Sequence, residues 1–261
     1  MSNMTNRLSD SQLADIAKQR YETQQQNQIP GVVVDLPSRG LVYPKSSVLR
    51  EGIVNMRYMT AYDEDILTNR NYIERGIVFD KLLESVITTP GFKVSELVEG
   101  DKSWLIIMVR VTSYDSKYPV QVKTPTGELI STYVDLSKLE FKPFNLTPDD
   151  NGEFEFHTSH NNVLKFKFLS SNIINNTPTE SRVSYILQNA ITQINEIRDK
   201  NKILEWMKYS FLRKESAEFR QYIIEHTPDV NTICKFEYKT NEGNMETFES
   251  TFPIRSDFFW I

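Results

Sequence analysis

The sequence predicts an α+β fold, in which helical segments are combined with antiparallel β-hairpins. Apolar residues repeat at helical spacing over several stretches, and pairs of alternating runs flank turn residues that are typical of hairpins. Twice along the chain, helices lead into such a hairpin, which ends near Leu136 in one case and near Ile254 in the other. A chain of 261 residues is long enough for one large domain or two small ones.

The composition excludes several classes of protein. Thirty Lys and Arg residues against 35 Asp and Glu residues give a formal charge of −5, whereas nucleic-acid binding requires an excess of basic side chains. The longest apolar run, residues 104–109, is far shorter than a membrane span, and the N-terminus lacks the apolar core of a signal peptide. A single cysteine, Cys234, can form neither an intramolecular disulfide nor a zinc site of several thiolates. We therefore expect synthesis in a reducing cytoplasm and no nucleic acid or membrane as a partner.

The first predicted segment, residues 1–28, is a helix followed by a polar linker. Leu13, Ile16, Ala17 and Tyr21 fall at helical spacing, and a glutamine-rich stretch follows them. Because this apolar stripe is narrow, we expect the helix to be mobile when the chain is alone. Docking of the stripe on a partner is the alternative.

The second predicted segment, residues 29–148, is a module of strands and helices that ends in a hairpin. Its first stretch, residues 29–44, contains three prolines and two glycines around a short strand, which indicates an ordered, extended segment with sharp turns. The pattern then predicts a strand over 53–59, helices from Thr60, from about Ile73 to Ile87 and from Asp101, and a hairpin that turns at 124–127.

The third predicted segment, residues 149–261, begins with an aromatic hairpin that turns at 159–162. Three helices follow, and the first of them carries apolar positions at helical spacing from Thr179 to Ile197. The other two are predicted over 199–212 and 216–226, before the last hairpin. The second and third segments either stand apart or share one core, and periodicity leaves both arrangements open.

The sequence carries no convincing catalytic or metal-binding constellation. The phosphate-loop, dinucleotide-binding, serine-hydrolase and zinc-protease motifs are absent. His157 lies on a predicted strand and His160 lies in the turn that follows it, which indicates a solvated turn. The acidic run 63–65 is better explained by capping of the helix that Thr60 begins. Cys234 alternates with apolar residues, as a strand cysteine does. We therefore expect a protein that is not an enzyme and that needs no metal or other cofactor.

Charged and aromatic residues in apolar surroundings raise two further expectations. Arg110 lies within an apolar helical run, so it needs a carboxylate or a backbone partner if it is buried, and we expect a structural ion pair. Phe258, Phe259 and Trp260 form a bulky aromatic cluster late in the sequence. These rings either cover the chain's own core or insert into a partner, since aromatic side chains supply much of the energy of protein interfaces.

Three sequence blocks carry a resemblance to a known family. They are LPSRGLVYP from Leu36, MTAYDEDIL from Met59 and GDKSWLIIMVR from Gly100, and the DFFW stretch from Asp257 adds to them. In this combination the chain resembles the baseplate proteins of T4-like contractile-tailed bacteriophages, the group of baseplate hub subunits and hub assembly proteins. The resemblance covers roughly residue 29 to the end, and it leaves open whether the aromatic hairpin over residues 154–168 is included. Many of these relatives carry paired cysteines in two hairpins, which this sequence lacks, so the resemblance implies no metal site here.

The resemblance implies a structural or assembly role in the baseplate hub at the tail tip, performed by protein binding. It implies a location in the tail baseplate of the virion, synthesis in the host cytoplasm, and other hub or tail proteins as partners, with a homo-oligomer left open. A transient assembly chaperone, absent from the mature virion, is the alternative, and a hydrolase of the cell envelope ranks last. The residues expected to contact partners are Arg39, Tyr43, Phe258, Phe259 and Trp260, and each also has a simpler intramolecular role.

Overall fold

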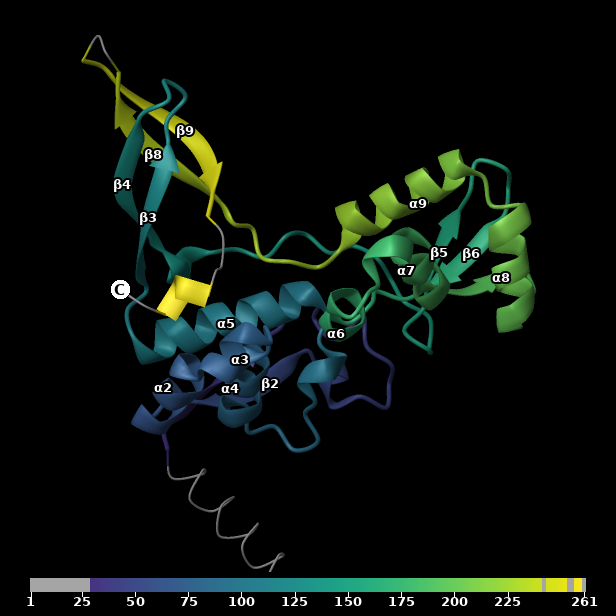
Figure 1. The fold of residues 1–261 in the computed structure, drawn as a ribbon, viewed down its shortest axis with the longest axis horizontal. Coiled ribbons are helices and arrows are strands. Elements are labelled where there is room, and N and C mark those ends of the chain that lie inside the picture. Colours follow the sequence, from purple (N-terminus) through teal and green to yellow (C-terminus); the bar gives the residue numbers. More distant parts are fainter. Residues whose placement is uncertain (1–28, 241–242, 253–255, 260–261) are drawn as a thin grey trace, which may run out of the picture.

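The computed structural model describes residues 29–240, 243–252 and 256–259, which form two lobes along the longest axis of the molecule (Figure 1). The first lobe contains residues 29 to about 148 together with residues 233–240, 243–252 and 256–259, and the second contains residues 149–226 (Figure 1). Helices and antiparallel sheets occur in both lobes, so the α+β class is confirmed. The helix predicted within residues 1–28 lies outside the described residues.

The first lobe begins with a two-stranded antiparallel sheet and continues with helices. Strand β1 (Gly31–Asp35) pairs with β2 (Ile53–Arg57), and the 3-10 helix η1 (Val48–Glu51) lies between them in sequence. The helix predicted from Ile73 to Ile87 is divided, because Gly76 adopts a φ of 66° and ends one helix before the next begins. The helices of this lobe are α2 (Ala61–Thr68), α3 (Arg70–Glu74), α4 (Val78–Val86), η2 (Val94–Glu96) and α5 (Glu99–Ser113).

Helix α5 is the central element of the first lobe, because most of its faces are buried. Leu105 and Ile107 have no exposed surface, and Val109 is 1% exposed. The apolar stripe of α4 is buried as well, with Leu82, Leu83 and Val86 fully covered, as their helical spacing predicts. Within the part of the chain that the structure describes, no helix combines the length and apolar character that crossing a bilayer needs.

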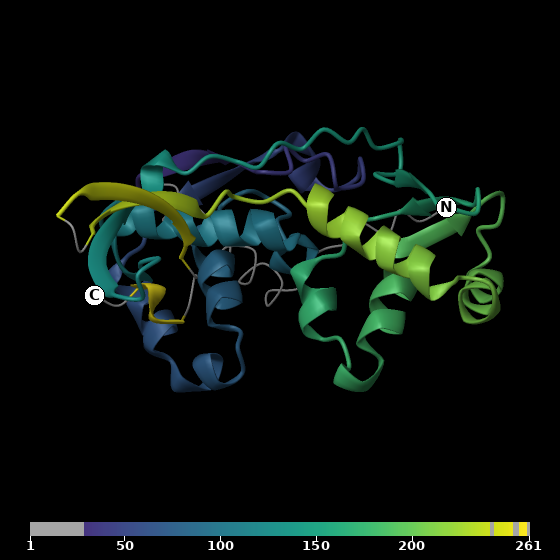
Figure 2. The same ribbon diagram turned by 90° about the horizontal axis from the view of Figure 1, so that it is seen from above.

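Two long hairpins lie side by side at one end of the first lobe (Figures 1 and 2). Both were predicted, and each forms its own two-stranded antiparallel sheet. In β3, for example, Val120 and Val122 alternate with exposed Gln121, so one face is buried and the other is open. The strands are β3 (Lys117–Lys123) and β4 (Leu129–Asp135), followed by η3 (Leu136–Lys138), and β8 (Ile233–Lys239) and β9 (Met245–Thr251).

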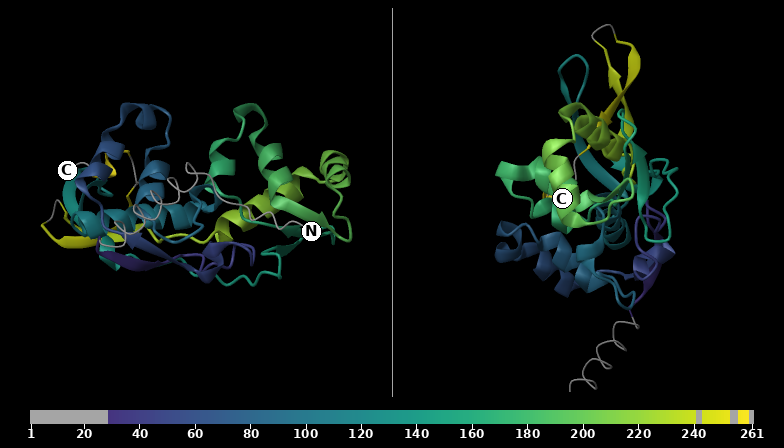
Figure 3. Two further views of the ribbon diagram at one scale, coloured as in Figure 1. Left: turned by 90° about the horizontal axis from the view of Figure 1, so that it is seen from below. Right: turned by 90° about the vertical axis from the view of Figure 1, so that its right-hand side faces the viewer.

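The second lobe contains a three-stranded antiparallel sheet in the order β5-β6-β7. Its core is aromatic, since the rings of Phe154, Phe166, Phe168 and Phe219 contact one another. Helices α6 and α7 project on the same side of the molecule as α2 and α3 of the first lobe (Figures 2 and 3). The elements are β5 (Phe154–His157), β6 (Val163–Phe166), α6 (Ser171–Asn175), η4 (Thr179–Ser181), α7 (Arg182–Ala190), β7 (Ile191–Ile194), α8 (Lys200–Tyr209) and α9 (Arg213–His226).

The helix predicted from Thr179 to Ile197 is wrong in its last third. Helix α7 ends at Ala190, and residues 191–194 pair with β6 as strand β7. The backbone of the β-branched Ile191 is extended, with a ψ of 121°, and Asn195 has a positive φ of 48° just after the strand. Pairing with β6 supplies backbone hydrogen bonds to a strand edge that would otherwise lack them. Local periodicity does not contain information about such long-range hydrogen bonds.

After α9 the chain returns to the first lobe, which periodicity did not indicate. Residues 227–232 run antiparallel to residues 139–144, where Lys142 N donates to Asp229 O at 2.8 Å and Asn231 N donates to Glu140 O at 2.8 Å. Hairpin β8–β9 and the 3-10 helix η5 (Ser256–Phe259) therefore belong to the first lobe in space. The buried apolar side chains of the two lobes form one contiguous cluster. The segment boundary predicted at residue 148 stays a prediction about folding units.

Candidate functional site

Four chain segments meet at the N-terminal end of α5, and we call this region the joint. It consists of residues 36–45, residues 97–101, the turn 149–153 and residues 228–229. The carboxylate of Asp101 lies at its centre and has no exposed surface. Ser38 N donates to Asp101 Oδ1 at 2.9 Å, and Ser38 Oγ donates to Asp101 Oδ2 at 2.6 Å. These hydrogen bonds fix the proline-rich residues 36–45 to the start of α5.

Tyr43, which the sequence analysis places among the expected partner contacts, is a buried member of the joint. Its side chain is 3% exposed, and its hydroxyl donates to Asp101 Oδ2 at 2.7 Å while accepting from Val98 N at 3.2 Å. Burial, and then the negative charge of Asp101, raise the pKa of Tyr43 well above its usual value. The phenol therefore keeps its proton and acts as a hydrogen-bond donor to Asp101.

The electrostatics of Asp101 are unusual because none of the described basic residues forms an ion pair with it. Burial raises the pKa of Asp101 to about 6, and the neighbouring carboxylate of Asp229 adds to this rise. The hydrogen bonds from Ser38 and Tyr43 oppose it, since they stabilise the charged form. The Asp101 carboxylate is therefore partly protonated under mildly acidic conditions.

Two glycines allow other segments to approach the joint closely. A Cβ atom on Gly100 would collide with the carbonyl oxygen of Pro228, so only glycine lets the returning chain lie against α5. Gly152, at a φ of 70°, lies against the carbonyl of Tyr43, and a Cβ there would be 3.0 Å from that oxygen. The joint therefore connects both lobes through close backbone packing.

Arg39, the second expected contact residue in this loop, is exposed but tethered. Its backbone has a positive φ of 51°, and its guanidinium donates to the carbonyl of Phe144, in the segment that leads to the second lobe. A direct connection between the lobes lies nearby, where Ser171 N donates to Leu97 O at 2.8 Å. The structure thus brings Arg39 and Tyr43 together, although their side chains bond to different segments.

Phe258 and Phe259 pack far from the joint, beside the C-terminal half of α5. They are 0% and 1% exposed, and the Phe258 ring contacts Tyr118 with 4.8 Å between the ring centres. Phe259 contacts Phe79 at 5.9 Å. Of the two roles open for these rings, the structure shows contact with the chain's own core. Trp260 lies outside the described residues.

Arg110 is fully buried beside these rings, and its expected ion pair is not found among the described residues. Its guanidinium donates to the carbonyl of Phe258, and its carbon Cζ lies 4.9 Å from the centre of the Tyr118 ring and 5.3 Å from that of Phe258. A backbone carbonyl and aromatic faces thus replace the carboxylate. Burial lowers the pKa of Arg110 from its usual value.

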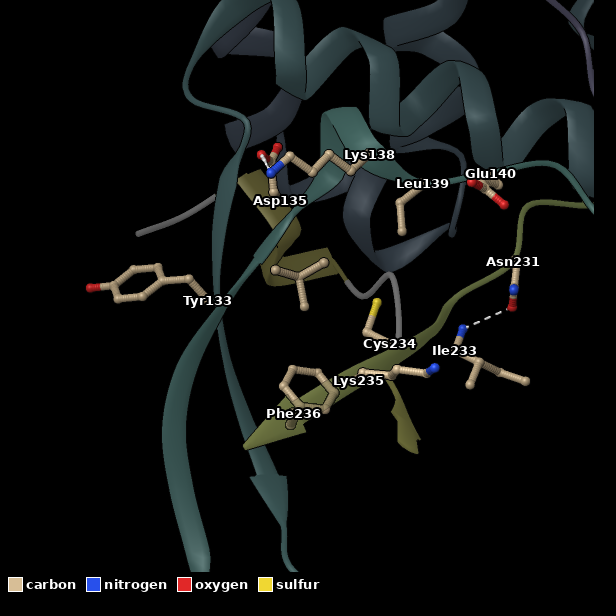
Figure 4. Close-up of a pocket in the computed structure, with 11 residues that line it drawn as sticks. Tyr133, Asp135, Lys138, Leu139, Glu140, Asn231, Ile233, Cys234, Lys235 and Phe236 are labelled. Carbon is tan, nitrogen blue, oxygen red and sulfur yellow. Dashed lines mark hydrogen bonds and ion pairs between the residues drawn. The ribbon is translucent and has the colours of Figure 1, made fainter. Parts of the chain in front are cut away.

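An opening of about 380 Å³ lies between strands β4 and β8 (Figure 4). Cys234 and Phe236 line it from β8, and Leu139 lines it from the segment after η3. Burial raises the pKa of the Cys234 thiol, which makes it less reactive, in agreement with the expected strand cysteine. Within the described residues, no group of three or more His, Cys, Asp or Glu side chains is placed to hold a metal ion.

The sequence analysis missed Asp101 as the centre of the joint. It treated this residue only as the start of a helix, which fits the observed start of α5 at Glu99. The available signal was that Asp101 follows Gly100 at the start of an apolar helix. Its hydrogen-bond partners Ser38 and Tyr43, however, are about 60 positions away in sequence. No local pattern connects residues over that distance.

The comparisons with known proteins give one clear result. Neither the curated proteins nor the solved structures contain a match to the chain. The sequence profile of one family, described as T4 bacteriophage base plate protein, matches residues 35–253, which include the joint, both lobes and all four hairpin strands at the end of the first lobe. The chain therefore belongs to the family of T4 bacteriophage base plate proteins.

Proposed function

We propose that this baseplate protein is a structural subunit of the baseplate hub of a contractile-tailed phage, and that it acts by binding other hub or tail proteins. Its family supports a structural or assembly role in the baseplate. The observation that carries the proposal further is the exposure of large apolar side chains on both lobes. In the first lobe these are Leu129 and Tyr133, each 68% exposed, and in the second they are Tyr209 and Ile224, 70% and 68% exposed.

The joint supports a permanent structural part in this proposal. Buried hydrogen bonds around Asp101 fix residues 36–45 on α5 within the first lobe. The close approaches of Gly100 to Pro228 and of Gly152 to Tyr43 then hold the chain that enters and leaves the second lobe. A connector with fixed segments can hold two binding surfaces at a constant spacing. This is the property that a subunit of a repeated assembly needs, because each contact must recur in the same place.

Within this proposal the expected contact residues divide into two groups. Arg39 is exposed and can meet a partner directly, and Trp260 is kept as a proposed contact. Tyr43, Phe258 and Phe259 are buried, so they act on a partner through the shape of the surface that they support. Substitution of these three residues is therefore expected to affect stability before it affects binding.

The test is quantitative mass spectrometry of purified phage particles beside a lysate of infected cells. Copies of this chain are counted against tail proteins of known copy number, which serve as internal standards. A fixed low-integer ratio in particles is the expected result for a hub subunit, and cross-linking within those particles then identifies its neighbours. Presence in the lysate with near absence from particles would instead identify a transient assembly chaperone.

A further inference from the structure

The two long hairpins expose four strand edges, and the register shows which backbone groups each edge presents. Leu136 N donates to Ser116 O, and Thr124 N donates to Glu128 O, which sets the phase of the β3–β4 ladder. Even-numbered residues of β4 therefore bond to β3, while odd-numbered residues direct their N–H and C=O groups outward. On β4 these are Leu129, Ser131, Tyr133 and Asp135, and the backbone groups of the first three bond to no residue that the structure describes.

The other three edges carry residues that oppose the addition of a further strand. In the β8–β9 hairpin, Thr240 N donates to Asn244 O, so the odd-numbered residues of both strands direct their backbone groups outward. Proline offers no N–H group, and charged side chains on an edge disfavour pairing. Such residues are Lys117, Pro119 and Lys123 on β3, Lys235, Glu237 and Lys239 on β8, and Glu249 on β9.

The β4 edge differs in the position of its charge. Asp135 stands at the end of the strand, where Ser137 N and Oγ donate to its carboxylate, and residues 129–133 contain neither a charge nor a proline. Leu129 and Tyr133 are each 68% exposed on the outer face of the hairpin, with Ser131 midway between them. Figure 4 shows the Tyr133 side chain pointing away from Cys234 and Phe236. Strand β8 does not pair with this edge, since β4 and β8 belong to separate sheets, and an opening lies between β8 and residues 133–135.

We propose that β4 pairs edge to edge, antiparallel, with β4 of a second copy of this chain, with Ser131 opposite Ser131. In this register Leu129 of each copy lies opposite Tyr133 of the other, so the two exposed apolar residues cover each other twice. The result is a continuous four-stranded sheet in the order β3-β4-β4-β3. A two-fold contact requires a patch that matches itself, and leucine, serine and tyrosine at alternate positions do so.

The contact is small, which sets the expected affinity. Five residue pairs with about six backbone hydrogen bonds bury less area than a standard interface of roughly 1,200–2,000 Å². We therefore expect weak association of the free chain and full occupancy where copies are concentrated, as in an assembling particle. The inference rests on the binding role proposed above and adds a self-contact to it.

The first experiment is sedimentation velocity of the purified full chain over a series of concentrations. The wild-type chain is expected to dimerise with increasing concentration. Leu129→Lys is expected to stay monomeric, because the lysine of each copy then lies against the Tyr133 ring of the other. Adding Tyr133→Glu to Leu129→Lys is expected to restore the dimer, since each introduced lysine then faces an introduced glutamate. Only the proposed register makes this rescue possible.

The matched control is Met245→Lys, which removes a 63% exposed apolar side chain from the β9 edge and is expected to leave the dimer intact. Circular dichroism and thermal melting of each variant verify that the fold is unchanged. A second measurement uses Ser131→Cys combined with Cys234→Ser. Residues in a hydrogen-bonded antiparallel pair lie about 5.5 Å apart, so oxidation is expected to link two copies by a disulfide.

Three outcomes would overturn the self-contact: a wild-type chain that is monomeric at every concentration, an absence of rescue in the double variant, or a loss of the dimer in Met245→Lys. The particle count is independent of these results. A monomeric chain found at a fixed ratio in particles contradicts only the dimer, whereas a dimeric chain that is absent from particles contradicts only the hub subunit.

Discussion

At the scale of single residues, the ion pair between Arg57 and Asp63 is the most heavily buried charge pair among the described residues of the first lobe. The side chains are 8% and 2% exposed, and Arg57 Nη1 lies 2.7 Å from Asp63 Oδ2. Thr60 N and Ser85 Oγ also donate to this carboxylate, each at 2.7 Å. The capping role expected for the acidic run is thus confirmed for Asp63, which in addition neutralises a buried guanidinium.

Replacing Asp63 by asparagine is expected to lower the free energy of unfolding by about 3–5 kcal/mol, because Arg57 is left buried without a counter-charge. Chemical denaturation at neutral pH measures this loss. The matched control is Glu74→Gln, which breaks the Arg70–Glu74 pair, whose side chains are 91% and 62% exposed. We expect a change of at most about 0.5 kcal/mol there. Equal effects of the two variants would contradict the importance of burial.

The same carboxylate gives the stability a dependence on acid. Burial alone would raise the pKa of Asp63, but hydrogen bonds from Arg57, Ser85 and Thr60 outweigh it and lower the pKa from 3.8 to about 2. The folded protein therefore holds the charged form more strongly than the unfolded chain. This contribution is complete above pH 4 and is lost as the pH falls towards 2, and a comparison of wild type with Asp63→Asn isolates it.

Asp101 is expected to act in the opposite direction. Its pKa is raised from 3.8 to about 6, so the folded state binds more protons than the unfolded state between these values. Its contribution to stability is therefore full below pH 4 and declines by on the order of 3 kcal/mol as the pH rises to 6. Denaturation curves of wild type and Asp101→Asn between pH 4 and pH 7 test this, and equal slopes would contradict it.

At the scale of elements, sequence patterns were reliable where one element buries its own face. The stripe of α4 and the alternation of Val120 and Val122 in β3 predicted the buried sides, because those periods depend only on local geometry. They failed at residues 191–194, where pairing with β6 overrides helical spacing. The joint was not predicted as a site. Arg39 and Tyr43 were singled out as partner contacts, which stays a prediction, and Asp101 was not singled out, since its partners are distant in sequence.

The close packing of α5 on the returning chain gives a prediction about one element. Gly100→Ala is expected to destabilise the protein by about 1–3 kcal/mol, because the added methyl group meets the carbonyl of Pro228. Ser103→Ala, a half-buried position on the same helix, is the control and is expected to change stability little. Hydrogen exchange of residues 228–231 locates the effect, and unchanged exchange there would show that the helix itself was disturbed instead.

At the scale of the whole molecule, the second lobe is an insertion between two parts of the first. Its aromatic core, formed by residues such as Phe154, Phe166 and Phe219, draws its ring contacts mainly from residues 154–222. We expect residues 146–229 to fold alone with a cooperative thermal transition. Far-ultraviolet circular dichroism and melting of that fragment measure this, and a non-cooperative transition would show that the lobe depends on the joint.

The return of the chain to the first lobe also determines the order in which the protein can fold during synthesis. The second lobe is complete once α9 has left the ribosome, whereas the β3–β4 hairpin still lacks its neighbour β8–β9 and the rings of Phe258 and Phe259. Until those residues emerge, the apolar face of β3–β4 has nothing to cover it. A chain that stops before β8 therefore leaves Tyr118 without its contacts to Phe252 and Phe258, and the first lobe stays incomplete.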